Sequence, residues 1–135
     1  LGRMGLGRAM VACGRTETGA PMDEFSTIGV TEVAEWRDGR VETFRLDPAT
    51  LGFSPCGSSV FSVEDAQGSA MAIRAILRGE ESGPRRELVI LNAAAALRVV
   101  GRGEGWEGSL ALAREVMDSG AAWRKLEQVR AFLEG

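Results

Sequence analysis

The chain has 135 residues, with 16 Lys and Arg against 19 Asp and Glu, no His, no Tyr and two Cys. The lack of histidine excludes Ser-His-Asp and Cys-His nucleophiles, histidine metal ligands and histidine pH switches. A formal net charge of −3 with 44% apolar residues is typical of one ordinary globular domain without a clustered basic surface. We therefore expect neither nucleic acid nor a membrane as a partner.

The predicted location is the cytoplasm. No apolar run approaches the ~20 residues that cross a bilayer, and the start lacks the pattern of a secretory signal. Cys13 and Cys56 form no Cys-x-x-Cys pair and suit reduced thiols, with Cys13 in the core and Cys56 in a loop. The sequence opens on Leu1, and residues 1–7 have Leu and Met spaced like the end of a helix, which suggests a fragment.

The first predicted strand covers residues 8–14, an apolar run closed by glycine. Such a run predicts a strand buried on both faces, as in the parallel sheets of α/β proteins. If further strands of the same sheet precede the chain, the edge of residues 8–13 is unpaired and invites association. Residues 15–29 show no period of 2 or 3.6, and an irregular stretch of that length is more often functional than idle.

A β-hairpin is predicted over residues 31–46. Two segments rich in β-branched and aromatic residues, 31–36 and 40–46, are separated by Arg37-Asp38-Gly39, and Asp-Gly supplies the positive φ angles of a tight turn. Asp47-Pro48 then ends the strand, because proline has no N–H for the ladder. A stretch rich in Gly, Ser and Pro continues to residue 59.

The second half of the chain predicts helices. A Ser62 cap with Asp65 three residues later begins the first helix, which ends at Gly79. The second helix covers residues 83–101 and is apolar nearly all round, so we expect it to be almost wholly buried.

Two further helices, the third and fourth of the chain, complete the pattern. The third helix ends at Ser119-Gly120. Apolar residues at helical spacing define the stripes of the first, third and fourth helices. They are Ala66, Ala70, Ile73 and Leu77; Leu110, Ala113 and Met117; and Ala122, Leu126, Val129 and Leu133.

Asp23 and Glu24, within residues 22–27 of the irregular stretch, are the candidate site residues. Two adjacent carboxylates on irregular backbone can face one cavity, and hard oxygen ligands suit Mg²⁺ that carries substrate phosphates. The end of a parallel strand is also where α/β sheets bind ligands. On spacing alone, a solvated pair of acids is the more common explanation.

Other features favour structural explanations. Gly2, Gly5 and Gly7 precede a strand and so cannot form a phosphate cradle at a helix start. The pair Arg85-Arg86 is typical of a solvated helix end. Asn92 within an apolar helix indicates a buried, hydrogen-bonded polar group, because burial without a partner costs about 1–3 kcal/mol.

Six segments resemble, in order, the C-terminal part of anthranilate phosphoribosyltransferase, and together they cover nearly the whole chain. They are residues 8–14, 22–35, 73–80, 83–86, 91–97 and 112–115 with 118–120. The sequence departs from the family pattern at three places. Cys13 stands where the family has His, Ile28-Gly29-Val30 stands where it has Thr-Gly-Pro, and residues 65–70 replace a Gly-Gly and Asn-Ala pattern.

The resemblance implies an α/β fold, the C-terminal part of a nucleoside phosphorylase/phosphoribosyltransferase-type α/β domain with a buried strand, a β-hairpin and about four helices. Residues 1–135 would form one partial domain, with the strand, metal loop and hairpin in 1–59 and a helical half in 60–135. The family's N-terminal helical domain and phosphate-binding motif would be absent.

The resemblance also implies Mg²⁺-dependent transfer of 5-phosphoribose from phosphoribosyl pyrophosphate to anthranilate in tryptophan biosynthesis. Asp23 and Glu24 match the family's acidic pair and would hold the Mg²⁺. The parent enzyme would be a homodimer, and this chain alone would be inactive.

Two alternatives remain open. One is a family relative that keeps the fold as a non-catalytic binding module, although the acidic composition disfavours nucleic acid as its ligand. The other is a pyrimidine nucleoside phosphorylase relative, because that class shares the fold.

Overall fold

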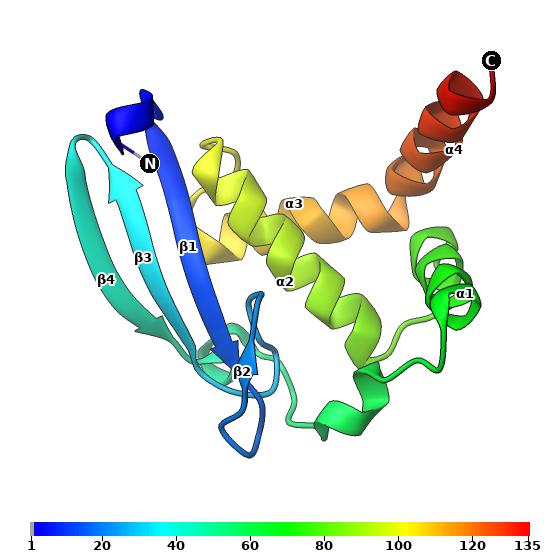
Figure 1. Ribbon diagram of the computed structural model, residues 1–135, viewed down its shortest axis with the longest axis horizontal. Coiled ribbons are helices and arrows are strands. Elements are labelled where there is room, and N and C mark those ends of the chain that lie inside the picture. The colour runs from blue at the N-terminus through cyan, green and yellow to red at the C-terminus, as the bar shows by residue number, and fades with distance from the viewer. Residues whose placement is uncertain (1) are drawn as a thin grey trace.

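Four antiparallel strands form one sheet in the computed structural model, which describes residues 2–135. The order across the sheet is β2-β1-β3-β4 (Figure 1). The strands are β1 (Arg8–Arg15), β2 (Pro21–Met22), β3 (Thr31–Arg37) and β4 (Arg40–Leu46). Short 3-10 turns lie over Gly2–Met4, Pro48–Leu51 and Ser58–Phe61.

Four helices follow the strands in the chain, and none of the described helices is long and apolar enough to cross a membrane. α2 lies across one face of the sheet and packs on α3, while α1 and α4 lie together farther from the sheet (Figure 1). The helices are α1 (Ala66–Arg78), α2 (Pro84–Val99), α3 (Gly105–Asp118) and α4 (Ala121–Glu134). The fold class is therefore α/β, as expected.

The core lies between the sheet, α2 and α3. Ile90 and Leu91 of α2 are fully buried, and Val33 of β3 and Leu110 of α3 pack into the same cluster. Burying a side chain of this size stabilises the fold by roughly 1.5–3 kcal/mol. The core therefore fixes α2 against the sheet face that carries Val33.

The predicted hairpin is confirmed. β3 pairs with β4 from Thr31↔Leu46 to Arg37↔Arg40. Asp38 and Gly39 have φ values of 51° and 79°, the left-handed conformations that a two-residue hairpin turn requires. The turn chemistry thus sets the register that points Val33 into the core.

The prediction that residues 8–14 belong to a parallel sheet and are buried on both faces is wrong. β1 runs antiparallel to both β2 and β3, and Val11 is 57% exposed. Cys13 is only half-buried rather than a core residue. An apolar run indicates that a strand is buried on one face or on both, but it carries no information about the direction of the neighbouring strands.

One edge of β1 is open within the described residues. β2 pairs only with Gly14 and Arg15, so residues 8–13 have a neighbouring strand on the β3 side alone. The expected association through this edge stays a prediction. The opening helix end predicted over residues 1–7 is a 3-10 turn at Gly2–Met4, and Leu1 lies outside the described residues.

The helix ends confirm most of the predicted boundaries. α1 ends at Gly79, α2 begins after Gly83, and α3 ends at Ser119. The cap of α1 is a correction, because Asp65 rather than Ser62 accepts the hydrogen bond of Gly68 N–H, at 2.7 Å. Ser62 instead ends the preceding 3-10 turn.

Two predicted burial patterns are also wrong. The buried residues of α2 lie on one face, at Ile90, Leu91, Ala94 and Ala95, whereas Val89 is 37% exposed. In the predicted stripes of α1 and α4, Ile73 is 49% and Leu133 is 76% exposed. The spacing correctly predicted helices but not what covers them.

The capping assignment predicts different costs for two substitutions before α1. Asp65→Ala removes the acceptor for Gly68 N–H and should lower the free energy of unfolding by about 1 kcal/mol. Ser62→Ala removes no cap and should change that free energy by less than about 0.5 kcal/mol. Urea denaturation of both variants measures the difference, and equal losses would contradict the assignment.

Candidate functional site

Asp23 and Glu24 follow β2 directly and lie at the end of β1, beside α2. Both line a pocket of about 290 Å³. Asp23 is exposed and Glu24 is half-buried. The remaining lining residues are Met10, Ala12, Phe25, Asn92, Ala95, Ala96 and Val99. The two acids therefore share a concave surface between the sheet and a helix.

The two carboxylates repel each other, and the Glu24 carboxylate is partly desolvated. Burial and the neighbouring charge of Asp23, in that order, raise the pKa of the Glu24 carboxyl. Neither carboxylate forms a hydrogen bond or ion pair with a side chain that the structure describes, so both negative charges are available to a ligand. A bound cation would lower this electrostatic cost.

The donor set suits Mg²⁺ shared with a substrate. No group of three or more His, Cys, Asp or Glu side chains in the described part of the chain could hold a metal by itself. Mg²⁺ is usually bound through one or two carboxylates, with waters and substrate phosphates as its remaining ligands. Asp23 and Glu24 could supply these carboxylates.

Ser26 fastens the segment that follows the acids. Its Oγ donates to the carbonyl of Arg15 at 2.7 Å and accepts from the N–H groups of Ile28 and Gly29, both at 3.1 Å. Its own N–H donates to Oγ1 of Thr31 at 2.9 Å. Ser26 and Thr31 are fully buried, so these bonds tie the loop to the ends of β1 and β3.

Gly14 allows the loop to approach β1 closely. A Cβ at this position would overlap the carbonyl oxygen of Glu24 and come within 2.9 Å of Ser26 Cβ. Gly14 is buried and pairs with Met22 in the sheet. The backbone of Glu24 therefore packs directly on β1, which only glycine permits.

Asn92 joins the loop to α2. Its Oδ1 accepts from the Phe25 N–H and its Nδ2 donates to the Phe25 carbonyl, both at 3.0 Å. The expectation of a hydrogen-bonded polar group is confirmed, although Asn92 is half-buried. The Phe25 ring packs edge-on against Trp106 of α3, with centroids 5.5 Å apart. Sequence spacing could not show that the partner of Asn92 is the acidic loop.

The expectation that Arg85 and Arg86 are solvated is wrong. Arg85 donates to the carbonyls of Val60 and Ser62, and Arg86 forms an ion pair with Asp118. The side chain of Arg86 is only 13% exposed. Both guanidinium groups thus hold neighbouring segments against α2.

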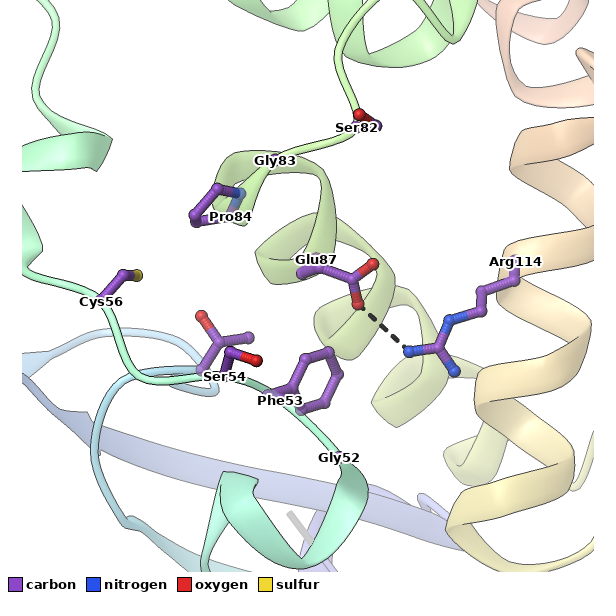
Figure 2. Close-up of a pocket in the computed structure, with 10 residues that line it drawn as sticks. Gly52, Phe53, Ser54, Cys56, Ser82, Gly83, Pro84, Glu87 and Arg114 are labelled. Atoms are coloured by element: carbon purple, nitrogen blue, oxygen red, sulfur yellow. Dashed lines mark hydrogen bonds and ion pairs between the residues drawn. The ribbon is translucent and has the colours of Figure 1, made fainter.

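A second pocket, of about 340 Å³, lies between Phe53 and the start of α2 (Figure 2). Glu87 and Arg114 face each other there, and their ion pair measures 3.1 Å (Figure 2). Because this carboxylate is already neutralised, the pocket offers a cation less than the Asp23-Glu24 pair does. The acidic loop is therefore the candidate site.

The close packing around Gly14 predicts that a methyl group at this position destabilises the fold. Gly14→Ala should lower the free energy of unfolding by about 1–3 kcal/mol, because the Glu24 backbone must move away from β1. Gly7→Ala is the control, since a Cβ at Gly7 meets no atom within 4 Å. Thermal unfolding of the two variants gives the comparison, and equal melting temperatures would contradict the close contact.

The raised pKa of Glu24 predicts a pH-dependent effect of neutralising it. The folded state holds this proton more tightly than the unfolded state, so the ionised carboxylate costs stability above the folded pKa. Glu24→Gln should therefore raise the free energy of unfolding at pH 7, by an amount that solvent screening of this half-buried group keeps small.

The gain should disappear below the ordinary glutamate pKa, where both states are protonated. Glu115→Gln, an exposed carboxylate on α3, serves as the control. Urea denaturation across pH 3–8 measures both variants. A loss of stability in Glu24→Gln at pH 7 would contradict the assigned cause.

The relatives found by comparison with known proteins carry the same name. Anthranilate phosphoribosyltransferase of Methanocorpusculum labreanum is 40% identical over 126 residues, which are 93% of this chain and 35% of the relative. The enzyme of the same name from Myxococcus xanthus is 41% identical over 136 residues, covering 100% of this chain and 38% of the relative. The chain thus spans little more than a third of the length of these relatives.

Solved structures share the fold. Anthranilate phosphoribosyltransferase from Thermus thermophilus matches with a TM-score of 0.80 at 30% identity, over 99% of this chain and 38% of that chain. The Saccharomyces cerevisiae enzyme in complex with PRPP and Mg matches with a TM-score of 0.71 at 23% identity, over 87% of this chain and 33% of that chain.

A family model covers most of the chain. Residues 1–123 match the model described as glycosyl transferase family, a/b domain. The matched range includes the sheet, the acidic loop, α1, α2 and α3. The chain therefore belongs to this glycosyl transferase family.

Proposed function

We propose that the complete polypeptide in which this sequence occurs transfers 5-phosphoribose from phosphoribosyl pyrophosphate to anthranilate, a step of tryptophan biosynthesis. The relatives that cover nearly all of this chain carry the name anthranilate phosphoribosyltransferase. The observation that carries the proposal is the Asp23-Glu24 pair, unpaired within the described residues and lining one pocket.

In this proposal Asp23 and Glu24 hold Mg²⁺. The Saccharomyces cerevisiae enzyme of the same fold is known in complex with PRPP and Mg, and we assign the same metal and substrate here. When bound, the metal supplies positive charge for a leaving pyrophosphate. The raised pKa of Glu24 supports the assignment, because an unpaired and partly desolvated carboxylate gains most from a cation.

Ser26 of the loop and Gly14 of β1 keep the acids in place. Ser26 ties the loop to β1 and β3, and Gly14 allows the Glu24 backbone to rest on β1. The acids thus stand on fixed backbone rather than on a free loop, which electrostatic stabilisation of a developing charge requires.

We further propose that this chain alone is inactive, that the complete enzyme is a cytoplasmic homodimer, and that neither nucleic acid nor a membrane is a partner. The chain spans 35–38% of the length of these relatives, which supports the proposal that other parts of the complete polypeptide contribute to the substrate site. The partial domain of residues 1–135 would supply the metal-binding side of that site.

The test replaces the two acids in the complete polypeptide. Asp23→Asn and Glu24→Gln each remove a negative charge while keeping side-chain shape, and each should lower the rate at limiting Mg²⁺ by roughly 100-fold. Phosphoribosyl-anthranilate formation is measured against Mg²⁺ concentration. Glu115→Gln should leave the curve unchanged, and an unchanged curve in both acid variants would remove the metal role.

A further inference from the structure

The Asn92 side chain and the Phe25 backbone form a closed pair of hydrogen bonds. The Phe25 N–H donates to Oδ1 and the Phe25 carbonyl accepts from Nδ2, each at 3.0 Å, across 67 positions of sequence. The second hydrogen on Nδ2 goes to the carbonyl of Leu88, also at 3.0 Å and one turn earlier in α2. That third bond fixes the plane of the amide, so Asn92 presents its donor and acceptor in one orientation.

Only a planar amide can make these contacts. A carboxylate lacks both donors, a hydroxyl cannot span the N–H and the carbonyl of one residue, and an apolar side chain makes neither bond. Glutamine keeps the amide but is one methylene longer, so it would push the loop away from α2. The contact therefore sets the distance between Phe25 and the helix.

Phe25 follows Glu24 in the chain, so the distance between Phe25 and α2 also determines where the two acids lie. The carboxylates of Asp23 and Glu24 have no partner among the described side chains, and their place is set by the backbone that carries them. Ser26 anchors that backbone to the sheet, whereas Asn92 anchors it to α2. α2 also supplies Ala95 and Ala96 to the pocket wall that faces the acids.

We propose that Asn92 is a positioning residue for the metal site, holding the Asp23-Glu24 carboxylates at a fixed distance from α2 so that both can reach one cation. The inference rests on the proposed function. Groups that orient metal ligands without touching the metal typically change metal affinity or activity by about 10- to 100-fold when they are removed.

The experiment measures two quantities in the complete polypeptide: the Mg²⁺ dependence of turnover and, independently of activity, the binding of Mn²⁺ as a substitute for Mg²⁺ by electron paramagnetic resonance, which should weaken by the same factor. Asn92→Ala should raise the half-saturating Mg²⁺ concentration by about 10- to 100-fold, with the turnover number recovering towards the parent value at saturating Mg²⁺. A merely structural role would lower the active fraction and leave the half-saturating concentration unchanged. The change in Mg²⁺ requirement is therefore the deciding readout.

A second variant separates lost hydrogen bonds from a cavity. Asn92→Leu fills the space of the amide but leaves the Phe25 N–H and carbonyl without partners. Positioning predicts the same raised Mg²⁺ requirement in Asn92→Ala and Asn92→Leu, and the leucine variant alone carries the test if the alanine variant does not fold. Asp65→Ala, which uncaps α1 far from the loop, should keep the parent Mg²⁺ requirement.

The outcomes distinguish the inference from the proposed function. If Asp23→Asn and Glu24→Gln raise the Mg²⁺ requirement but the folded Asn92 variants do not, Asn92 has no positioning role and the metal assignment stands. If neither the acid variants nor the Asn92 variants change it, the metal assignment itself is wrong.

Discussion

The structure depends on the attachment of one irregular loop to two rigid elements. Ser26 bonds the loop to the ends of β1 and β3, and Asn92 bonds it to α2. The core that fixes α2 against the sheet therefore also fixes the two attachment points relative to each other. Because a displacement of about 1 Å can cost 10²-fold in rate, such double attachment suits residues that bind a reacting group.

The electrostatics of the loop oppose its burial. Two adjacent carboxylates lie in one pocket, and desolvation adds to their repulsion at Glu24. Several partly buried side chains in the described part of the chain pair with an opposite charge, as in Arg86–Asp118, Arg114–Glu87 and Arg98–Glu35. The acids at positions 23 and 24 depart from this pattern, which is the physical reason to assign them a cation as partner.

The conformational preferences of single residues make part of the fold predictable from the sequence. Asp38-Gly39 dictates a tight turn, and Gly79 ends α1 because its φ of 76° favours glycine. The direction of β1's neighbours and the partner of Asn92 depend on contacts between residues far apart in the chain, which periodicity does not encode. Their place on an irregular stretch after a strand marks Asp23 and Glu24 as a candidate site, but only the family resemblance favours a metal role, because an acidic dipeptide alone is most often solvated.

The central claim is that Asp23 and Glu24 bind the metal, and its most direct test is anomalous diffraction. Crystals of the complete polypeptide would be grown with Mn²⁺, a substitute for Mg²⁺, and with phosphoribosyl pyrophosphate. The account predicts an anomalous peak within coordination distance of a carboxylate oxygen of Asp23 or Glu24 and of the pyrophosphate. A pyrophosphate-bound peak with both carboxylates remote from it would contradict the account.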